Sequence, residues 1–270
     1  MAPRLPLEVL ERIIDDVAAD YGNNDNVSSV KACALVCYYF LPLCRKHIFA
    51  SVTLNAQHPT SDGLNHLLSN SPHLATYIRN LDYQVDRKEI VAKRFPWLLL
   101  MFKKLVKLQK LSIRYSFSGR TDRLDWMSSS VRKVLLPLLH LPTLTSISLS
   151  TIRNFALEDL AGCVNLNELE INSLECSNGV GKSLEALPTT PVMLERLAIS
   201  NGKISSVQQL CRARRPDGKP IVDFSSLKKI TAEVARLDSM KELFVICRNL
   251  RNINLSCTSL PHLISGSSSI

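Results

Sequence analysis

The chain has 270 residues, 46% hydrophobic and 21% charged, with a formal net charge of +9. This composition is that of an ordinary globular protein, so it excludes a mainly disordered chain, and no stretch approaches the roughly 18 apolar residues of a membrane span. The N-terminus reaches charged residues at once and contains no secretory apolar run, so we expect a cytoplasmic or nuclear protein.

The first predicted helix follows the N-terminal segment "LPLEVLERIIDDVAA". Pro6 can begin a helix without losing a hydrogen bond, because the first amides of a helix have no partner within it. The apolar residues then recur at i, i+3, i+4 and i+7, which is the spacing of one helical face. They are Leu10, Ile13, Ile14 and Val17.

Two more short helices are predicted between residues 28 and 50. Ser28 or Ser29 can cap the second, and Pro42 is expected to end it and to begin the third. The apolar face of the second helix consists of Cys33, Val36, Cys37 and Phe40. The third carries Leu43, Cys44 and Ile48. Three helices this short bury little area alone, so a partner or the following domain must cover part of their apolar surface.

The second and third helices also contain a possible metal-ligand pattern. Cys33, Cys37, Cys44 and His47 read C-x3-C-x6-C-x2-H, which fits zinc spacing only in part. Free cysteine on a helix face packs as a small hydrophobe, so we favour packing and predict no metal. We interpret the eight scattered cysteines as free buried thiols, and His47 as a solvated or interface residue.

The segments "LPLEVLERII", "ALVCYYF" and "LCRKHIF" resemble an F-box, particularly its fungal form, over about residues 4 to 50. The resemblance implies a module that docks on the Skp adaptor of a Skp-cullin-F-box ubiquitin ligase. Tyr38 and Tyr39 depart from it, because a basic residue often follows the cysteine there. The positions that the resemblance assigns to adaptor binding are Leu5, Pro6, Leu10, Ile13, Ile14, Leu35, Val36, Cys37 and Phe40.

The rest of the chain, residues 51–270, repeats one strand-like pattern. Seven segments read apolar-x-x-apolar-x-apolar, and their second apolar residues are 22 to 36 positions apart, about 29 on average. These residues are Leu81, Leu111, Ile147, Leu169, Leu197, Ile230 and Ile253. Helix-like segments separate them, at 97–107, 128–141, 205–214 and 238–250. We predict an α/β fold: a leucine-rich-repeat-like solenoid of about seven irregular units, with parallel strands on its concave side and helices on its convex side. The irregular spacing resembles F-box proteins with degenerate leucine-rich repeats.

The concave face of such a solenoid is a candidate target-binding surface. The residue between the last two apolar positions of each unit should point away from the core. This row is Asp82, Ser112, Ser148, Glu170, Ala198, Thr231 and Asn254, flanked by Arg114, Ser146, Glu168, Asn172, Arg196, Lys229 and Asn252. The face is polar and mixed in charge, whereas a strand-tracking nucleic-acid site needs Lys, Arg and interleaved aromatics.

The basic excess lies beyond the first fifty residues, which hold five Lys or Arg against six Asp or Glu. We place it on a solvated convex surface, with a nucleic-acid or nuclear-import patch as the alternative. The basic residues concerned are Lys93, Arg94, Lys103, Lys104, Lys107, Lys110 and those of the loop "CRARRPDGK" at 211–219. The final segment, "LRNINLSCTSLPHLISGSSSI", ends soon after a strand, so either the last unit is exposed or the chain is shorter than typical relatives.

No complete catalytic motif is present. The nearest to a phosphate loop is "SNGVGKS" at 177–183, which lacks the first glycine of that motif and is interpreted as an inter-repeat loop. Five further cysteines lie in or beside leucine-rich segments, where core packing is their usual role. They are Cys163, Cys176, Cys211, Cys247 and Cys257.

The sequence therefore predicts a ligase adaptor that performs no chemistry itself and needs no cofactor. Residues 1–50 would bind a Skp adaptor, and through it a cullin ligase, while residues 51–270 would bind a protein substrate. The positions of the concave face that we predict to contact the substrate are Asp82, Ser112, Ser148, Glu170, Arg196, Thr231 and Asn254. The alternative is a repeat scaffold or nucleic-acid-associated protein outside any ligase, whose N-terminal helices only cap the solenoid.

Overall fold

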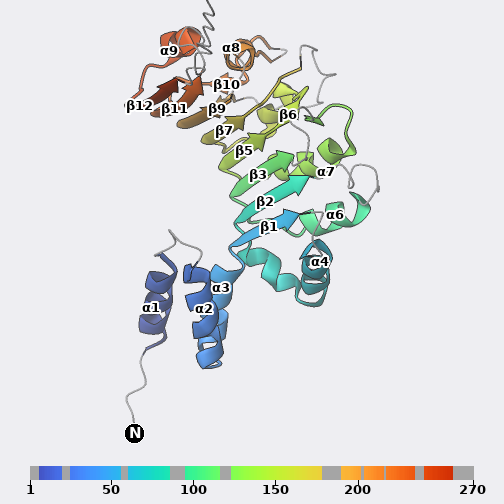
Figure 1. Cartoon of the computed structure of the whole chain (residues 1–270), viewed down its shortest axis with the longest axis vertical. Helices are drawn as coiled ribbons and strands as arrows, with labels where there is room; N and C mark the ends of the chain where they lie inside the picture. The colour runs from blue at the N-terminus through green and yellow to red at the C-terminus, as the bar shows by residue number, and fades with distance from the viewer. Residues whose placement is uncertain are drawn as a thin grey trace, which may run out of the picture.

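The computed structural model describes residues 6–19, 25–55, 60–85, 95–115, 123–177, 190–201, 204–215, 217–234 and 240–257. Three N-terminal helices lie at one end of a long sheet, and further helices lie along one side of that sheet (Figure 1). None of the helices in these ranges is both long and apolar enough to cross a membrane.

The N-terminal helices are α1 (Leu7–Ala19), α2 (Asp25–Val36) and α3 (Phe40–Ile48). The carbonyl of Pro6 accepts hydrogen bonds from the amides of Val9 and Leu10, so this proline stands just before α1 as the sequence predicts. The three helices share a small core of their own, separate from that of the sheet. Its buried members are Ile14, Ala18, Val30 and Cys44.

The boundary between α2 and α3 differs from the prediction. Helix α2 begins at Asp25, so Ser28 and Ser29 lie inside it rather than before it. Pro42 is the third residue of α3, where a missing amide leaves no helical hydrogen bond unmade. The predicted single apolar face of Cys33, Val36, Cys37 and Phe40 is therefore wrong, because α2 ends at Val36 and Cys37 lies in the turn.

The main sheet has eight strands that follow one another in chain order, and every neighbouring pair is parallel. This confirms the predicted α/β class with a parallel sheet. Each of the seven predicted segments overlaps a strand that begins two residues after the first residue of the segment and extends beyond its end, and β1 is an eighth strand that the repeat pattern did not predict. The strands are β1 (Ser51–Asn55), β2 (Asn80–Val85), β3 (Lys110–Tyr115), β5 (Ser146–Ser150), β7 (Glu168–Asn172), β9 (Arg196–Ser200), β11 (Lys229–Val234) and β12 (Asn252–Cys257).

Alternating side chains of each strand enter the core, as the period of two requires. The second apolar positions of the first six predicted segments are buried and stand side by side in the register. Ile253 is the exception, at 55% exposed. It lies on β12, the edge strand, where none of the described elements packs over it from the outer side.

The helical layer covers the apolar face of the sheet (Figure 1). Each of the four segments predicted as helix-like overlaps one helix, and α6 and α8 begin before their segments: α6 (Phe95–Phe102), α7 (Ser130–Leu139), α8 (Ile204–Arg212) and α9 (Lys241–Ile246). The layer also includes α4 (Thr60–Asn70), η1 (Pro72–Tyr77) and η2 (Leu157–Gly162). Two pairs of two-residue parallel strands complete it, β4 (Leu124–Asp125) with β6 (Ile152–Arg153), and β8 (Val192–Met193) with β10 (Val222–Asp223).

Three successive units leave the sheet through the same turn. The residue that follows β5, β7 or β9 has a positive φ in each case: 62° at Thr151, 51° at Ser173 and 48° at Asn201. The amide of Thr151 donates to the carbonyl of Asn172, and that of Ser173 to the carbonyl of Ser200. These units are therefore equivalent in backbone conformation although their sequences differ.

One buried carboxylate ties α7 to η2. Asp159 is fully buried and accepts hydrogen bonds from the Nε and terminal nitrogen of Arg132, at 2.8 and 2.7 Å, and from the indole Nε1 of Trp126 at 2.7 Å. The Nε2 of His140 lies 3.0 Å from the backbone carbonyl of the same residue. A buried charge with this many donors is compensated, so the network holds the helical layer in one arrangement.

Candidate partner-binding surfaces

The first candidate site is the end of α2 and the turn that leads to α3, residues Leu35 to Tyr39, which we call the apolar turn. Its four large side chains are between 68% and 88% exposed. They are Leu35, Val36, Tyr38 and Tyr39. Single exposed hydrophobes are ordinary on protein surfaces, but four within five consecutive residues indicate an interaction site.

Local geometry accounts for this exposure. Helix α2 ends at Val36, and the amides of Phe40 and Leu41 donate to the carbonyls of Cys37 and Tyr38 to form the turn. Phe40 then points back and packs against the small helical core. The turn leaves the two tyrosine rings outside, edge to face with centroids 6.3 Å apart.

The positions assigned to adaptor binding divide into three groups in the structure. Pro6, Leu35, Val36 and Cys37 are exposed, and Ile13 is 44% exposed. Leu10 and Phe40 are partly buried, whereas Ile14 is 1% exposed and belongs to the helical interior. Leu5 lies outside the described residues. The positions predicted from the F-box resemblance do not include Tyr38 and Tyr39. Two consecutive aromatic residues directly after "LVC" could have indicated that they are exposed in the same site.

Ion pairs fix the angle between α1 and α3. The ammonium of Lys46 lies 2.6 Å from Glu11 and 2.9 Å from Asp15, and the Nε2 of His47 lies 2.7 Å from Asp15. The hydrogen bond from Lys46 is the main reason why the pKa of Asp15 is lowered, so this carboxylate stays charged at neutral pH. His47 is thus partly buried and hydrogen-bonded to Asp15 within the helical module rather than freely solvated.

The cysteines of this module differ in environment. Cys44 is buried, Cys33 is partly buried, and Cys37 is exposed, so the prediction of a buried thiol is wrong for Cys37. Burial is the main cause that raises the pKa of the Cys44 thiol. Over the ranges that the structure describes, no three His, Cys, Asp or Glu side chains gather as a metal site would require.

The second candidate site is the polar face of the sheet, which we call the open face. The predicted outward row, Asp82, Ser112, Ser148, Glu170, Ala198, Thr231 and Asn254, stands in register across seven strands. The neighbouring row is Asn80, Lys110, Ser146, Glu168, Arg196, Lys229 and Asn252. Every residue of the two rows is partly or fully exposed, so none of the described elements covers this face.

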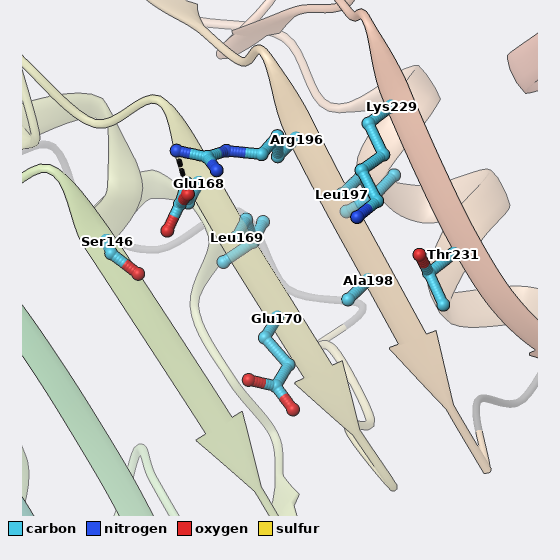
Figure 2. Close-up of a pocket in the computed structure, with 9 residues that line it drawn as sticks. All are labelled: Ser146, Glu168, Leu169, Glu170, Arg196, Leu197, Ala198, Lys229 and Thr231. Carbon is cyan, nitrogen blue, oxygen red and sulfur yellow. Dashed lines mark ion pairs between the residues drawn. The ribbon is translucent and has the colours of Figure 1, made fainter. Parts of the chain in front are cut away.

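Two adjoining hollows lie on the open face. One is centred on β7, β9 and β11, and its lining includes Glu170, Arg196 and Lys229 (Figure 2). The other lies toward β2 and β3, and Ser146, Glu168 and Glu170 line both. Small side chains form the middle of the face, so a bound chain can approach the sheet closely. They are Ser112, Ser146, Ser148 and Ala198.

Some charges on the open face pair with one another. Arg196 pairs with Glu168 on the next strand, as the dashed line in Figure 2 marks, and Arg114 pairs with Asp82, whose Oδ1 lies 2.9 Å from the guanidinium Nε. The Asp82 hydrogen bond, and more weakly the charge of Glu170, raise the pKa of Arg114. Cross-strand pairs of this kind cancel charge within the protein.

The basic residues are placed differently from the prediction at two points. Lys110 belongs to β3 and lies on the open face beside Asn80 and Ser146, not on the helical side. Arg215 is only 8% exposed, so the "CRARRPDGK" loop is not simply solvated. Lys103 and Lys107 are exposed after α6 as expected, Lys104 is partly buried, and Lys93 and Arg94 lie outside the described residues.

The remaining thiols are placed for packing rather than for chemistry. Burial raises the pKa of Cys163, Cys176 and Cys211 to about 12 and that of Cys247 to about 11. All four belong to or pack against the main core, as predicted. The side chain of Cys257 and residues 178–183 of the "SNGVGKS" segment lie outside the described residues.

Comparison with known proteins adds no assignment: no protein-family model matches this chain, and no curated protein matches it.

Proposed function

We propose that the chain is a substrate-recognition adaptor of a Skp-cullin-F-box E3 ubiquitin ligase. In this proposal α1 to α3 form an F-box-like module that binds a Skp adaptor, and the sheet with its helical layer is a leucine-rich-repeat-like solenoid that binds a target protein. The observation that carries the proposal is the apolar turn: four large exposed hydrophobes on a small helical module with its own core.

The exposed area is sufficient for an anchor. Fully burying one large apolar side chain contributes about 1.5–3 kcal/mol, so four contribute roughly 6–12 kcal/mol. Association costs about 4–15 kcal/mol before any contact is counted. The apolar turn alone thus offsets much of that cost, and the half-exposed Ile13 adds further apolar contact.

Two observations support the solenoid part of the proposal. The strand order follows the chain without exception, and three successive units share one left-handed turn after the strand. In repeat proteins each unit packs only against the units next to it in the chain. A polar, uncovered face opposite the helices is the surface that such proteins use for binding.

The test is co-expression of the full chain with a Skp adaptor, followed by capture of the adaptor. The wild-type chain should be retained, and the variant Leu35→Asp/Tyr38→Asp should be lost from the captured fraction. Both side chains are more than 80% exposed, so the substitutions leave the helical core intact. Val245→Asp is the matched control, because Val245 is 84% exposed on α9, in the part of the chain that holds the sheet. Failure to retain the wild-type chain, or equal retention of all three, contradicts the proposal.

A further inference from the structure

The open face carries three charged side chains that take no part in the ion pairs of Arg196 with Glu168 and of Arg114 with Asp82. Lys110 and Lys229 make no side-chain hydrogen bond or ion pair within the described residues. Glu170 also makes none, although its charge acts on Arg114. All three are exposed.

Their positions follow from the strand register. Lys110 on β3 and Lys229 on β11 occupy the same row, four strands apart. Glu170 lies on β7, midway between them and two residues further along the strand. Strands are spaced about 4.8 Å apart and rise about 3.3 Å per residue, so each lysine is about 12 Å from Glu170 along the sheet.

The surface between these charges admits an extended chain. Lys110 and Glu170 line one hollow, and Glu170 and Lys229 line the other, while Ser146, Ser148 and Ala198 keep the floor low. An extended peptide covers about 12–14 Å in four residues, and residues four apart point to the same side of it. Lys110 and Lys229 lie about 19 Å apart across four strand spacings, whereas the outer charges of such a peptide lie about 26 Å apart. The difference of about 3–4 Å at each end is within the reach of long lysine and glutamate side chains, so the peptide can meet all three protein charges at once.

We infer that the open face binds an extended protein segment with an acidic residue, a basic residue four positions later and a second acidic residue after four more. The acidic side chains face Lys110 and Lys229, and the basic one faces Glu170. The inference rests on the proposed role of this face in target binding and names the class of segment that it selects. The alternation of sign distinguishes such a segment from a nucleic-acid strand, which would meet Glu170 and Glu168 with like charge.

The experiment uses the full chain and fluorescein-labelled 13-residue peptides in a Gly, Ser and Ala background. One peptide carries Glu, Lys and Glu at positions 3, 7 and 11, and its counterpart carries Lys, Glu and Lys there. Fluorescence anisotropy at low salt should show the first binding at least tenfold more tightly. The triple charge swap Lys110→Glu/Glu170→Lys/Lys229→Glu should reverse that preference.

The matched control is Lys103→Glu/Lys133→Glu, which changes charges that are exposed on or near the helices and should keep the original preference. Circular dichroism confirms that each variant is folded. Equal affinity for the two peptides, no binding of either, or a preference that survives the triple swap overturns the inference. So does tighter binding of a labelled single-stranded oligonucleotide. None of these outcomes bears on adaptor capture by the apolar turn, so this inference and the adaptor proposal fail separately.

Discussion

Arg132 holds both carboxylate oxygens of Asp159, a residue with no exposed surface, from a helix 27 positions earlier in the chain. The indole of Trp126 shares the same carboxylate. This contact joins α7 to η2. Among the described residues, the Asp159 carboxylate is the buried charge with the most complete set of hydrogen-bond donors. It positions the helical layer that keeps the sheet in shape.

Replacing Asp159 with Asn should destabilise the protein strongly. The substitution removes the charge but leaves Arg132 and Trp126 with donors that an amide cannot fully satisfy. Breaking a buried pair in this way costs about 3–5 kcal/mol. Urea unfolding followed by circular dichroism measures the loss. Glu170→Gln is the control, because the side chain of this exposed residue makes no hydrogen bond to the described residues, and the substitution should change the free energy of unfolding by no more than about 0.5 kcal/mol. A loss of under 1 kcal/mol for Asp159→Asn would refute the structural role.

Gly162 should tolerate no side chain while His140 is present. A Cβ at Gly162 would lie 2.4 Å from two atoms of the His140 ring, closer than non-bonded atoms approach. We expect Gly162→Ala to cost about 1–3 kcal/mol, the usual range for overpacking. The same substitution in a His140→Ala background should cost less, because the ring is gone. Thermal unfolding of the four proteins of this cycle gives the coupling. Strict additivity would show that the ring is not the obstacle.

Thr151 sits in a conformation that suits it poorly. Its φ of 62° lies in the left-handed region, which β-branched residues rarely adopt, whereas Asn201 occupies the equivalent turn with a residue that tolerates it. Thr151→Asn should therefore stabilise the protein by about 0.5–1 kcal/mol. Urea titration would show this as a higher denaturation midpoint. Thr231→Asn, on an exposed strand position, serves as the control and should not stabilise. An unchanged or lower midpoint for Thr151→Asn would contradict the turn assignment.

The cysteines should separate sharply in reactivity at pH 8. Thiols with a pKa of about 12, such as Cys163, Cys176 and Cys211, hold only about one thiolate in ten thousand at that pH. Cys37 is exposed in the apolar turn and should react first with iodoacetamide, at least a hundred times faster than Cys163. Peptide mass spectrometry over a time course gives each rate. Comparable rates in the folded protein would mean that the turn is covered or the core is open.

The sheet could be predicted from sequence because its signal is local and repeated. Leu81, Leu111 and Ile147 each stand in a six-residue pattern that only one strand orientation satisfies, so their burial and register followed from spacing. Ile253 has the same pattern but lies on the edge strand, so its exposure depends on what packs beyond it, which a pattern within one unit does not contain.

The errors arose where tertiary placement decides the outcome. Pro42 was expected to break a helix, yet in the first turn of α3 it costs no hydrogen bond. Lys110 lies within a predicted strand segment but was grouped with the basic residues of the preceding helix-like segment, so its place on the open face was missed. Nothing in the sequence indicated the pair between Arg132 and the buried Asp159, because the contact joins distant segments.

The proposed function depends most on the binding of a Skp adaptor by the apolar turn. Calorimetric titration of the purified full chain with a purified Skp adaptor tests it directly. The account predicts one-to-one binding with a Kd of about 1 μM or tighter, weakened at least a hundredfold by Leu35→Asp/Tyr38→Asp and unchanged by Val245→Asp. No heat of binding with the wild-type chain, or equal affinity for all three proteins, would contradict it.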